Sequence, residues 1–332
     1  MTSPLTESEI QSRLARLDAL RDAIATAIVG QHDVVEQLLT GLLAGGHCLL
    51  EGVPGLGKTL LVRTLGQALD LQFRRVQFTP DLMPSDLLGT ELLEEDHGTG
   101  HRHFRFQQGP VFTNLLLADE LNRTPPKTQS ALLEAMQEHT VSYAGTTHAL
   151  PSPFFVLATQ NPIEQAGTYP LPEAQLDRFL LHIALEYPSE AEERDILLQT
   201  TGSRVVEVPR VMGGEDVLAL QALVREVHVG DDVLGWIARL VRATRPGDDA
   251  PTVVREYVRW GAGPRAGQSL VLAGKARALL QGRLAVTRED VAALAAPVLR
   301  HRLLLSFAAE AERKRPDDVV AALLREVPFS KA

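Results

Sequence analysis

Residues 52–59 form a complete G-x-x-x-x-G-K-[ST] loop, and this loop constrains the fold more strongly than any other feature of the sequence. The glycines of such a loop let backbone N–H groups close around phosphates, while Lys58 reaches the terminal phosphates and the Thr59 hydroxyl can bind Mg²⁺. Residues 47–51 are apolar enough for the strand that must precede it, and residues 60–69 carry leucines at fourfold spacing. The pattern predicts a strand, a loop and a helix that bind a nucleoside triphosphate; the alternative is a glycine-rich turn before a helix.

The length of 332 residues predicts two domains, since one domain takes about 150 residues. Hydrophobic content of 45% and charged content of 23% are typical of a globular protein. The net charge of -9 leaves no general basic surface, so nucleic acid is an unlikely partner.

Cys48 is the only cysteine, which excludes an intrachain disulfide and a thiolate metal site within one chain. Residues 1–11 are polar and lack the apolar segment of a secretion signal, and no run of about 18 apolar residues occurs. We therefore expect a cytoplasmic protein without membrane insertion.

Strand and helix patterns alternate in the first half of the chain. Two helical patterns precede the loop, and residues 73–78, 111–118 and 154–158 read as further strands. This alternation predicts a parallel sheet with helices on both faces. Residues 115–118 are apolar without alternation, as in a strand buried on both faces, so we expect them at the sheet centre.

Strand signals largely stop at a capping box, Ser189 with Glu192. Helical patterns follow over residues 232–243, 267–281, 288–300 and 317–326. We predict an α/β domain over residues 1–187 and an all-helical domain over residues 188–332.

Two carboxylates, Asp119 and Glu120, follow the most apolar strand, which places them at the sheet edge where the loop emerges. We expect Asp119 to hold Mg²⁺, directly or through water, and Glu120 to polarise the water that attacks the γ-phosphate. The alternative is two solvated loop acids. Asn161 follows the next strand and could orient the same water, although an Asn before Pro162 is also a common turn residue.

Several motifs together carry a family resemblance that spans most of the chain. They are residues 28–31, 52–59, 119–123, 126–138, 158–162, 169–179 and 263–266. The sequence resembles the AAA+ ATPases, and more closely the MoxR family, with residues 119–179 the most specific part. The resemblance implies ATP hydrolysis with Mg²⁺ by a P-loop AAA+ parallel-sheet domain with a C-terminal helical lid.

The resemblance also implies the residues that contact the nucleotide. Asn161 would be the sensor-1 residue, and Arg265, in the lid, the sensor-2 arginine, although Gly263 replaces the serine usual before Pro264. Ile28, Val29 and Gly30 would line the adenine pocket. The expected nucleotide contacts are Ile28, Val29, Gly30, Gly52, Pro54, Gly55, Leu56, Gly57, Lys58, Thr59, Leu60 and Arg265.

An arginine from a neighbouring subunit would complete the site, so the resemblance implies a ring, expected to be a hexamer. Arg178 would be this arginine, with Arg123 as a second candidate. The alternative for Arg178 is a salt bridge to Asp177 or a nearby acid. The catalytic set is then Lys58, Asp119, Glu120, Asn161 and Arg178, and the metal ligands are Thr59 and Asp119.

Two segments read as β-hairpins inserted into the α/β domain, over about residues 87–107 and 140–150. His97, His101 and His103 with Asp96 could form a metal site in the first hairpin, but a solvated face explains them more simply. Arg102 and Arg105 with Phe104 and Phe106 are explained by one short alternating strand, without nucleic acid.

The resemblance implies that hydrolysis drives chaperone-like remodelling, maturation or activation of a client protein with a von Willebrand factor A domain. Three alternatives stay open: a metal-chelatase-type motor subunit, a DNA-remodelling AAA+ motor, and a nucleotide switch that does not hydrolyse. The net charge argues against the DNA motor, and the Asp119–Glu120 pair against the switch.

Overall fold

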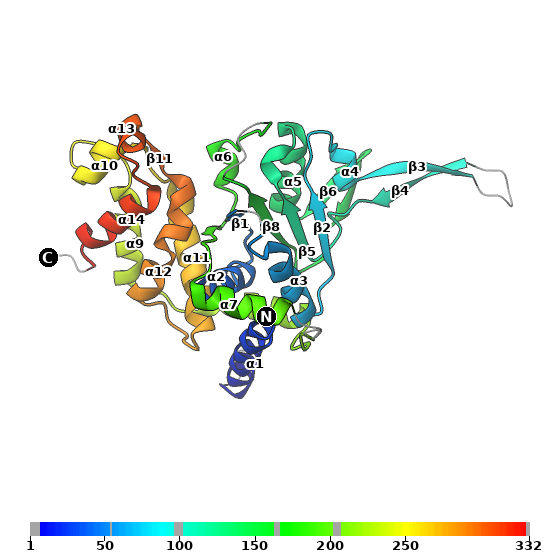
Figure 1. Cartoon of the computed structure of the whole chain (residues 1–332), viewed down its shortest axis with the longest axis horizontal. Helices are drawn as coiled ribbons and strands as arrows, with labels where there is room; N and C mark the ends of the chain where they lie inside the picture. Colours follow the sequence, from blue (N-terminus) through cyan, green and yellow to red (C-terminus); the bar gives the residue numbers. More distant parts are fainter. Residues whose placement is uncertain (1–6, 54, 96–101, 163–166, 202–206, 330–332) are drawn as a thin grey trace.

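The chain is represented by a computed structural model, which describes residues 7–53, 55–95, 102–162, 167–201 and 207–329. Figure 1 shows an α/β unit beside a helical unit, with a long hairpin extending from the α/β side. Within the described residues, no helix is both long and apolar enough to cross a membrane.

A parallel five-stranded sheet forms the centre of the α/β unit, as the alternating pattern predicted. Its spatial order is β2 (Phe73–Gln77), β5 (Leu115–Asp119), β8 (Phe155–Gln160), β1 (Cys48–Glu51) and β9 (Leu181–Ala184). The middle strand is β8, so the prediction that residues 115–118 occupy the centre is corrected: β5 is interior, between β2 and β8.

One predicted strand is shorter than expected, and one strand was not predicted. Residues 111–118 were predicted as one strand, but the strand begins at Leu115. Val111 and Phe112 are apolar and buried, yet they lie in the turn that precedes the strand. The edge strand β9 was not predicted, since its four residues, Leu181–Ala184, follow directly after another motif. Its pairing with β1 is what brings it into the sheet.

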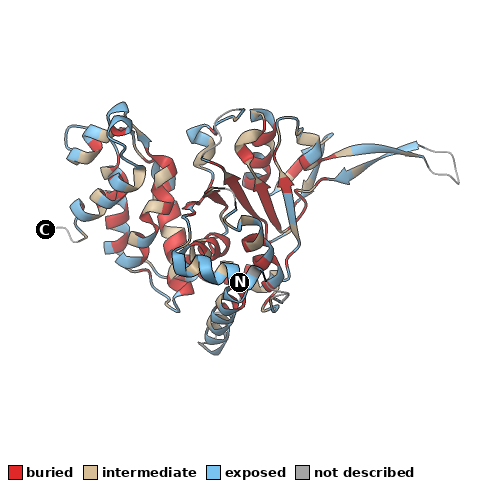
Figure 2. Cartoon of the chain, viewed as in Figure 1, coloured by how far each residue is buried: buried red, intermediate tan, exposed pale blue. Residues whose placement is uncertain are grey.

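Successive residues of β5 face opposite sides of the sheet and enter two separate cores. Leu115 and Leu117 belong to one core, which includes α2 (His32–Leu43) and α3 (Lys58–Ala68). Leu116 and Ala118 belong to the other, which includes α5 (Pro126–Glu138). Burial on both faces explains why this strand is uniformly apolar, and Figure 2 shows the buried sheet.

Short elements and a first helix complete the α/β unit: α1 (Glu7–Ala25), α4 (Pro84–Leu88), the 3₁₀ helix η1 (Leu121–Arg123) and α6 (Glu173–Leu176). The first hairpin consists of β3 (Gly89–Glu95) and β4 (Arg102–Gln108), and the second of β6 (Thr140–Tyr143) and β7 (Thr146–Ala149). Phe106 of β4 stacks on His148 of β7 with ring centroids 4.2 Å apart, so the two hairpins contact each other.

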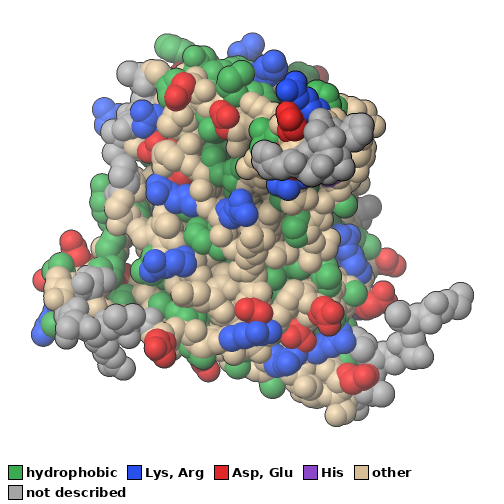
Figure 3. Space-filling model, turned by 90° about the vertical axis from the view of Figure 1, so that its right-hand side faces the viewer, with side chains coloured by type: hydrophobic (Ala, Val, Ile, Leu, Met, Phe, Trp, Pro, Cys, Tyr) green, Lys and Arg blue, Asp and Glu red, His purple; other side chains and the backbone are tan. Residues whose placement is uncertain are grey.

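The outer half of the first hairpin is exposed. Phe104 and Leu93 are 69% and 54% exposed, and Arg102 and Arg105 form ion pairs with Glu95 and Glu94 on the facing strand. In Figure 3, which faces this end of the molecule, Lys and Arg side chains are interspersed with Asp and Glu. Asp96, His97 and His101 lie outside the described residues. The described part of the chain contains no group of three or more His, Cys, Asp or Glu side chains that could hold a metal.

The helical unit contains the remaining elements of the described chain. They are α7 (Glu190–Thr200), α8 (Gly214–Glu226), α9 (Asp231–Ala243), α10 (Thr252–Tyr257), β10 (Val258–Trp260), α11 (Pro264–Leu280), α12 (Arg288–Leu299), η2 (Arg300–Arg302), β11 (Leu304–Leu305), α13 (Phe307–Ala311) and α14 (Pro316–Glu326). The Ser189–Glu192 capping box starts α7. On α8, Gln221 donates to the Leu42 carbonyl at 2.8 Å, which fastens this helix to the α/β unit. The boundary between residues 187 and 188 remains a proposal.

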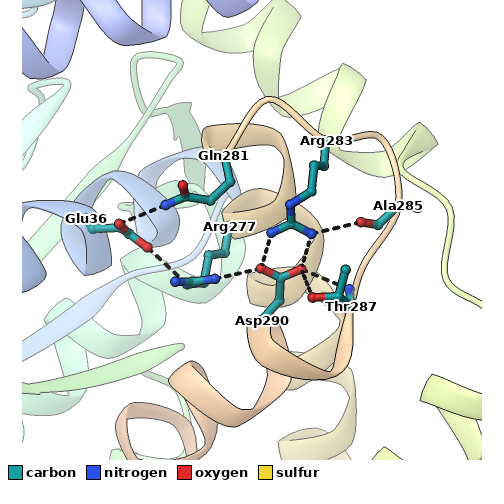
Figure 4. Close-up of polar contacts among 7 residues, drawn as sticks. All are labelled: Glu36, Arg277, Gln281, Arg283, Ala285, Thr287 and Asp290. Atoms are coloured by element: carbon teal, nitrogen blue, oxygen red, sulfur yellow. Dashed lines mark hydrogen bonds and ion pairs between the residues drawn. The ribbon is translucent and has the colours of Figure 1, made fainter.

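A network of charged side chains joins α11 and α12 to α2 (Figure 4). Asp290 is fully buried and accepts from Arg277 at 2.7 Å and from Arg283 at 2.6 Å. Arg277 also bridges to Glu36 of α2 at 3.0 Å. Burial opposes ionisation of Asp290, yet hydrogen bonds from Arg283, the Thr287 N–H and Arg277 hold its pKa below the ordinary value. The network thus docks the helical unit on the α/β unit through balanced charges.

Candidate active site

The loop at residues 52–57 joins β1 to α3, and Lys58 is the first residue of the helix. Gly55 and Gly57 have φ of 89° and 74°, a left-handed region that favours glycine. A Cβ added at either glycine would meet no heavy atom within 4 Å, so the backbone there borders open space, as a phosphate-binding loop requires. Pro54, an expected nucleotide contact, lies outside the described residues.

One cavity of about 430 Å³ brings together most of the residues predicted to carry the chemistry. It is lined by Gly55, Gly57, Lys58, Thr59, Leu60, Arg75, Gln77, Asp119, Glu120 and Asn161. Three parallel strands, β2, β5 and β8, end at this cavity, which explains how residues far apart in sequence converge. Arg75 and Gln77 were not predicted.

Asp119, at the end of β5, has both carboxylate oxygens engaged. Thr159 donates from Oγ1 to Oδ1 at 2.6 Å, and Arg75 donates from Nε and a terminal nitrogen to Oδ2 at 3.0 and 2.6 Å. The Thr159 hydroxyl oxygen also accepts from the Glu120 N–H at 2.9 Å. Thr159 therefore orients both residues of the carboxylate pair from the neighbouring strand.

Glu120 has a left-handed backbone, with φ of 57°, and its side chain is held by two donors. Gln77 Nε2 donates to Oε2 at 2.6 Å, and Arg123 donates to the same oxygen at 2.9 Å. Arg123, the second candidate for an intersubunit contact, thus pairs with Glu120 of its own chain.

Lys58 donates to the carbonyl of Gly52, the first glycine of the loop. Burial lowers the pKa of Lys58, and the charges of Asp119, Glu120 and Glu51 oppose that shift. Glu51 ends β1, and its pKa is held down chiefly by a hydrogen bond with His182, 2.8 Å away. A partly desolvated ammonium among carboxylates is poised to interact with a polyanionic phosphate chain.

A second cavity of about 290 Å³ lies near the segment predicted to contact adenine. Ile28 and Gly30 line it, whereas Val29 is not among its lining residues. Gln31 donates to the carbonyl of Leu56 at 3.2 Å, which ties this segment to the phosphate loop. Glu192 of α7 lies directly against Gly30, where an added Cβ would meet its Oε1 at 2.2 Å.

Arg265 and Arg178 lie together, away from the Lys58 cavity. Both line a small cavity of about 160 Å³, and neither is among the residues that line the cavity of Lys58. Asp177 pairs with Arg265 at 3.5 Å and with Arg302 at 2.6 Å. Arg178 is exposed, and in the described part of the chain it forms no ion pair, neither with Asp177 nor with another acid. Gly263 has an extended backbone, so the missing serine imposes no special conformation before α11.

Comparison with known proteins places this geometry in a family. The model of the ATPase family associated with various cellular activities matches residues 47–181, and an AAA lid domain model matches residues 250–323. Chaperone MoxR1 of Mycobacterium tuberculosis is 45% identical over 301 residues, which cover 90% of this chain and 78% of that protein. The chain belongs to the MoxR family of AAA+ ATPases.

Two further relatives of this MoxR-family ATPase match over nearly the whole chain. Protein MoxR of Methylorubrum extorquens is 32% identical, with 92% of each chain covered. A crystal structure of a candidate ATPase from Cytophaga hutchinsonii has a TM-score of 0.90, 41% identity and 98% coverage of each chain. The protein is accordingly an ATP hydrolase with an AAA+ domain and a helical lid.

Sequence reasoning missed four polar residues of this MoxR-family site: Arg75, Gln77, Thr159 and His182. A signal for the first two was present, because residues two apart at the end of a strand share one face and here flank the carboxylates on β5. Thr159 lies within the motif at residues 158–162, in which only Asn161 was predicted to have a role. His182 could not be found, since its strand, β9, was not predicted.

Proposed function

We propose that this protein couples ATP hydrolysis, in a hexameric ring, to chaperone-like remodelling or activation of a client protein with a von Willebrand factor A domain. The convergence of Lys58, Thr59, Asp119, Glu120 and Asn161 on one cavity supports the hydrolytic part. The chaperone part is supported by the 45% identity to a protein named as a chaperone. The client class is supported by the family resemblance alone.

The cavity offers the ligands that Mg²⁺ prefers. The Thr59 hydroxyl and the Asp119 carboxylate are hard oxygen donors on its wall, so the residues fit the ion. Mg²⁺ bound there with ATP would neutralise phosphate charge. Arg75 donates two hydrogen bonds to Oδ2 of Asp119 in this structure. If Mg²⁺ binds that oxygen, Arg75 would have to release it or share it with the ion.

Glu120 is proposed to polarise the attacking water, with Asn161 orienting that water from the end of β8. Gln77 and Arg123 both donate to Oε2 of Glu120, so Oε1 is the oxygen proposed to accept from that water. Lys58 and the loop backbone would bind the phosphates, and Ile28 and Gly30 would contact the base. These assignments share one requirement, an ATP that spans from the loop to the second cavity.

Arg178 is proposed as the arginine that reaches the ATP of a neighbouring subunit. Its exposed guanidinium is without an ion pair in the described chain, whereas Arg123 is engaged with Glu120. Arg265 lies beside Arg178, which favours a role toward the same neighbouring site over contact with the nucleotide of its own chain. The hairpins are proposed to contact the client, because exposed Phe104 and Leu93 leave apolar surface there.

Affinity capture with Glu120→Gln in the presence of ATP tests the proposal. The variant should bind ATP without turning it over, and so retain the client on the ring. The matched control is Lys58→Ala, which should lose nucleotide binding and with it the client. Recovery of a protein with a von Willebrand factor A domain on Glu120→Gln, and not on Lys58→Ala, is the expected result. Equal recovery on both variants would contradict nucleotide-dependent client binding.

A further inference from the structure

A groove of about 830 Å³ runs between α9 and α11 on the helical unit. Its lining is mostly apolar, with contributions from Ile237, Val241 and Val271, and Leu234 at its side is 40% exposed. An apolar groove of this size at a surface is suited to receive large side chains from another protein surface.

Three arginines, Arg225, Arg242 and Arg245, also line this groove, and all three are exposed. Among the described residues none of them has a carboxylate partner; Arg245 donates only to the carbonyl of Ala262, at 3.0 Å. In a chain of net charge -9 this groove is a local basic surface. The occupant it suits is therefore apolar and acidic at once.

Helix α7 of the same chain has this chemistry. Leu197 and Leu198 are 57% and 67% exposed, although leucine side chains gain by burial. Glu190 and Glu193 are exposed and lie seven and four residues before Leu197, which places them on its face of the helix. The face carries two exposed acids and a leucine that is 57% exposed.

We propose that α7 of one copy docks in the α9–α11 groove of the next copy around the ring. Leu197 and Leu198 would enter the apolar lining, while Glu190 and Glu193 would meet the arginine rim. Because the two surfaces are different parts of one chain, the contact is head-to-tail, the kind that closes into a ring.

The position of each surface agrees with this pairing, which rests on the proposed ring. Helix α11 contributes Pro264 and Gly267 to the groove and Arg265 to the separate cavity that Arg178 also lines, so the two sites lie on different sides of one helix. Helix α7 borders the base end of the nucleotide site, because Glu192 packs against Gly30. Because α11 carries both Arg265 and the groove residues, approach of Arg265 to a neighbouring nucleotide would also bring the groove near that neighbour, whose α7 borders its nucleotide site.

The test compares assembly of full-length variants by sedimentation with a non-hydrolysable ATP analogue. Leu198→Asp should raise the concentration for half-assembly at least tenfold, while binding of a fluorescent ATP analogue persists. The matched control is Leu93→Asp on β3, which is exposed to a similar extent, at 54%, and should assemble as the wild type does. Because both leucines are exposed, neither change should unfold the chain.

A charge swap tests whether Glu193 of one copy contacts Arg242 of the next. Glu193→Arg and Arg242→Glu should each weaken assembly at least threefold, and the double variant should recover most of the loss, whereas Glu193→Arg with Arg325→Glu should not.

A wild type that assembles, with Leu198→Asp assembling equally well, would overturn the docking and leave the groove to another occupant, such as the client. A wild type that stays monomeric, with turnover per chain independent of concentration, would overturn the ring itself.

Discussion

The Lys58 cavity and the Arg178–Arg265 face differ in how their charges are balanced. In the cavity, Arg75 and Arg123 pair with Asp119 and Glu120, so cations and carboxylates meet within one chain. On the other face Arg178 is exposed and without an ion pair among the described residues, while Arg265 and Arg302 share the single carboxylate of Asp177. A surface with more cations than nearby carboxylates is suited to an anionic partner, in agreement with the proposed contact of Arg178 with the ATP of a neighbouring subunit.

Replacing Arg178 should have the largest effect. Arg178→Ala should lower ATP turnover by about 10³ to 10⁵, the range for arginines that act on a neighbour's phosphate, while nucleotide binding persists. Steady-state phosphate release in the assembled protein measures this. Arg325→Ala, an exposed arginine of α14, is the control, and near-normal turnover of assembled Arg178→Ala would end the contrast between the two regions.

Within the cavity, Glu120→Gln should lower turnover by about 10² to 10⁴, the usual contribution of a positioned general base. In rings mixed with Arg178→Ala, the sites that keep Glu120 should regain turnover because a neighbouring Glu120→Gln subunit supplies Arg178, whereas the Glu120→Gln sites should stay inactive. Titrating the two variants together and following phosphate release checks this. Phosphate release that reaches the wild-type level per chain would show that Glu120→Gln sites also turn over, and would place the water-polarising group elsewhere.

The buried charge network around Asp290 should contribute to the free energy of unfolding. Asp290→Ala leaves Arg277 and Arg283 without their buried partner, and losing one partner of a buried pair costs about 3 to 5 kcal/mol. Urea denaturation should show this decrease in the free energy of unfolding. Glu36→Gln, which breaks only the partly exposed outer contact, should cost about 1 kcal/mol or less. Equal losses for the two variants would contradict the balanced network.

The smallest effect concerns His47, whose pKa burial lowers to about 4. Between that value and about 6.5 the unfolded chain binds more protons than the folded one, so stability falls as pH falls. From pH 7 to pH 5 this one residue should cost about 2 kcal/mol. Urea denaturation at the two pH values measures the decrease, and His47→Gln should make it smaller by that amount. An unchanged pH dependence in the variant would show that His47 is not the titrating group.

Local patterns predicted the parts of the fold that have local causes. The Ser189–Glu192 capping box, the apolar β5 and the glycine loop each depend on residues within one element, and each was recognised. The edge strand β9 was missed because its four residues become a strand only by pairing with β1. The central place of β8 likewise follows from strand order, which local sequence does not encode.

The sequence by itself determined the chemistry of the nucleotide site, because the loop at residues 52–59, Asp119 and Glu120 have residue types and spacings that few other functions need. Only the tertiary structure decided which side chains hold these groups and which arginines stand apart. Arg75 and Gln77 meet the carboxylates through pairing of β2 with β5, and Arg265 meets Arg178 through the docking of α11. The physical reason is that a charge is balanced by what lies near it in space, and that proximity is set by packing across the chain.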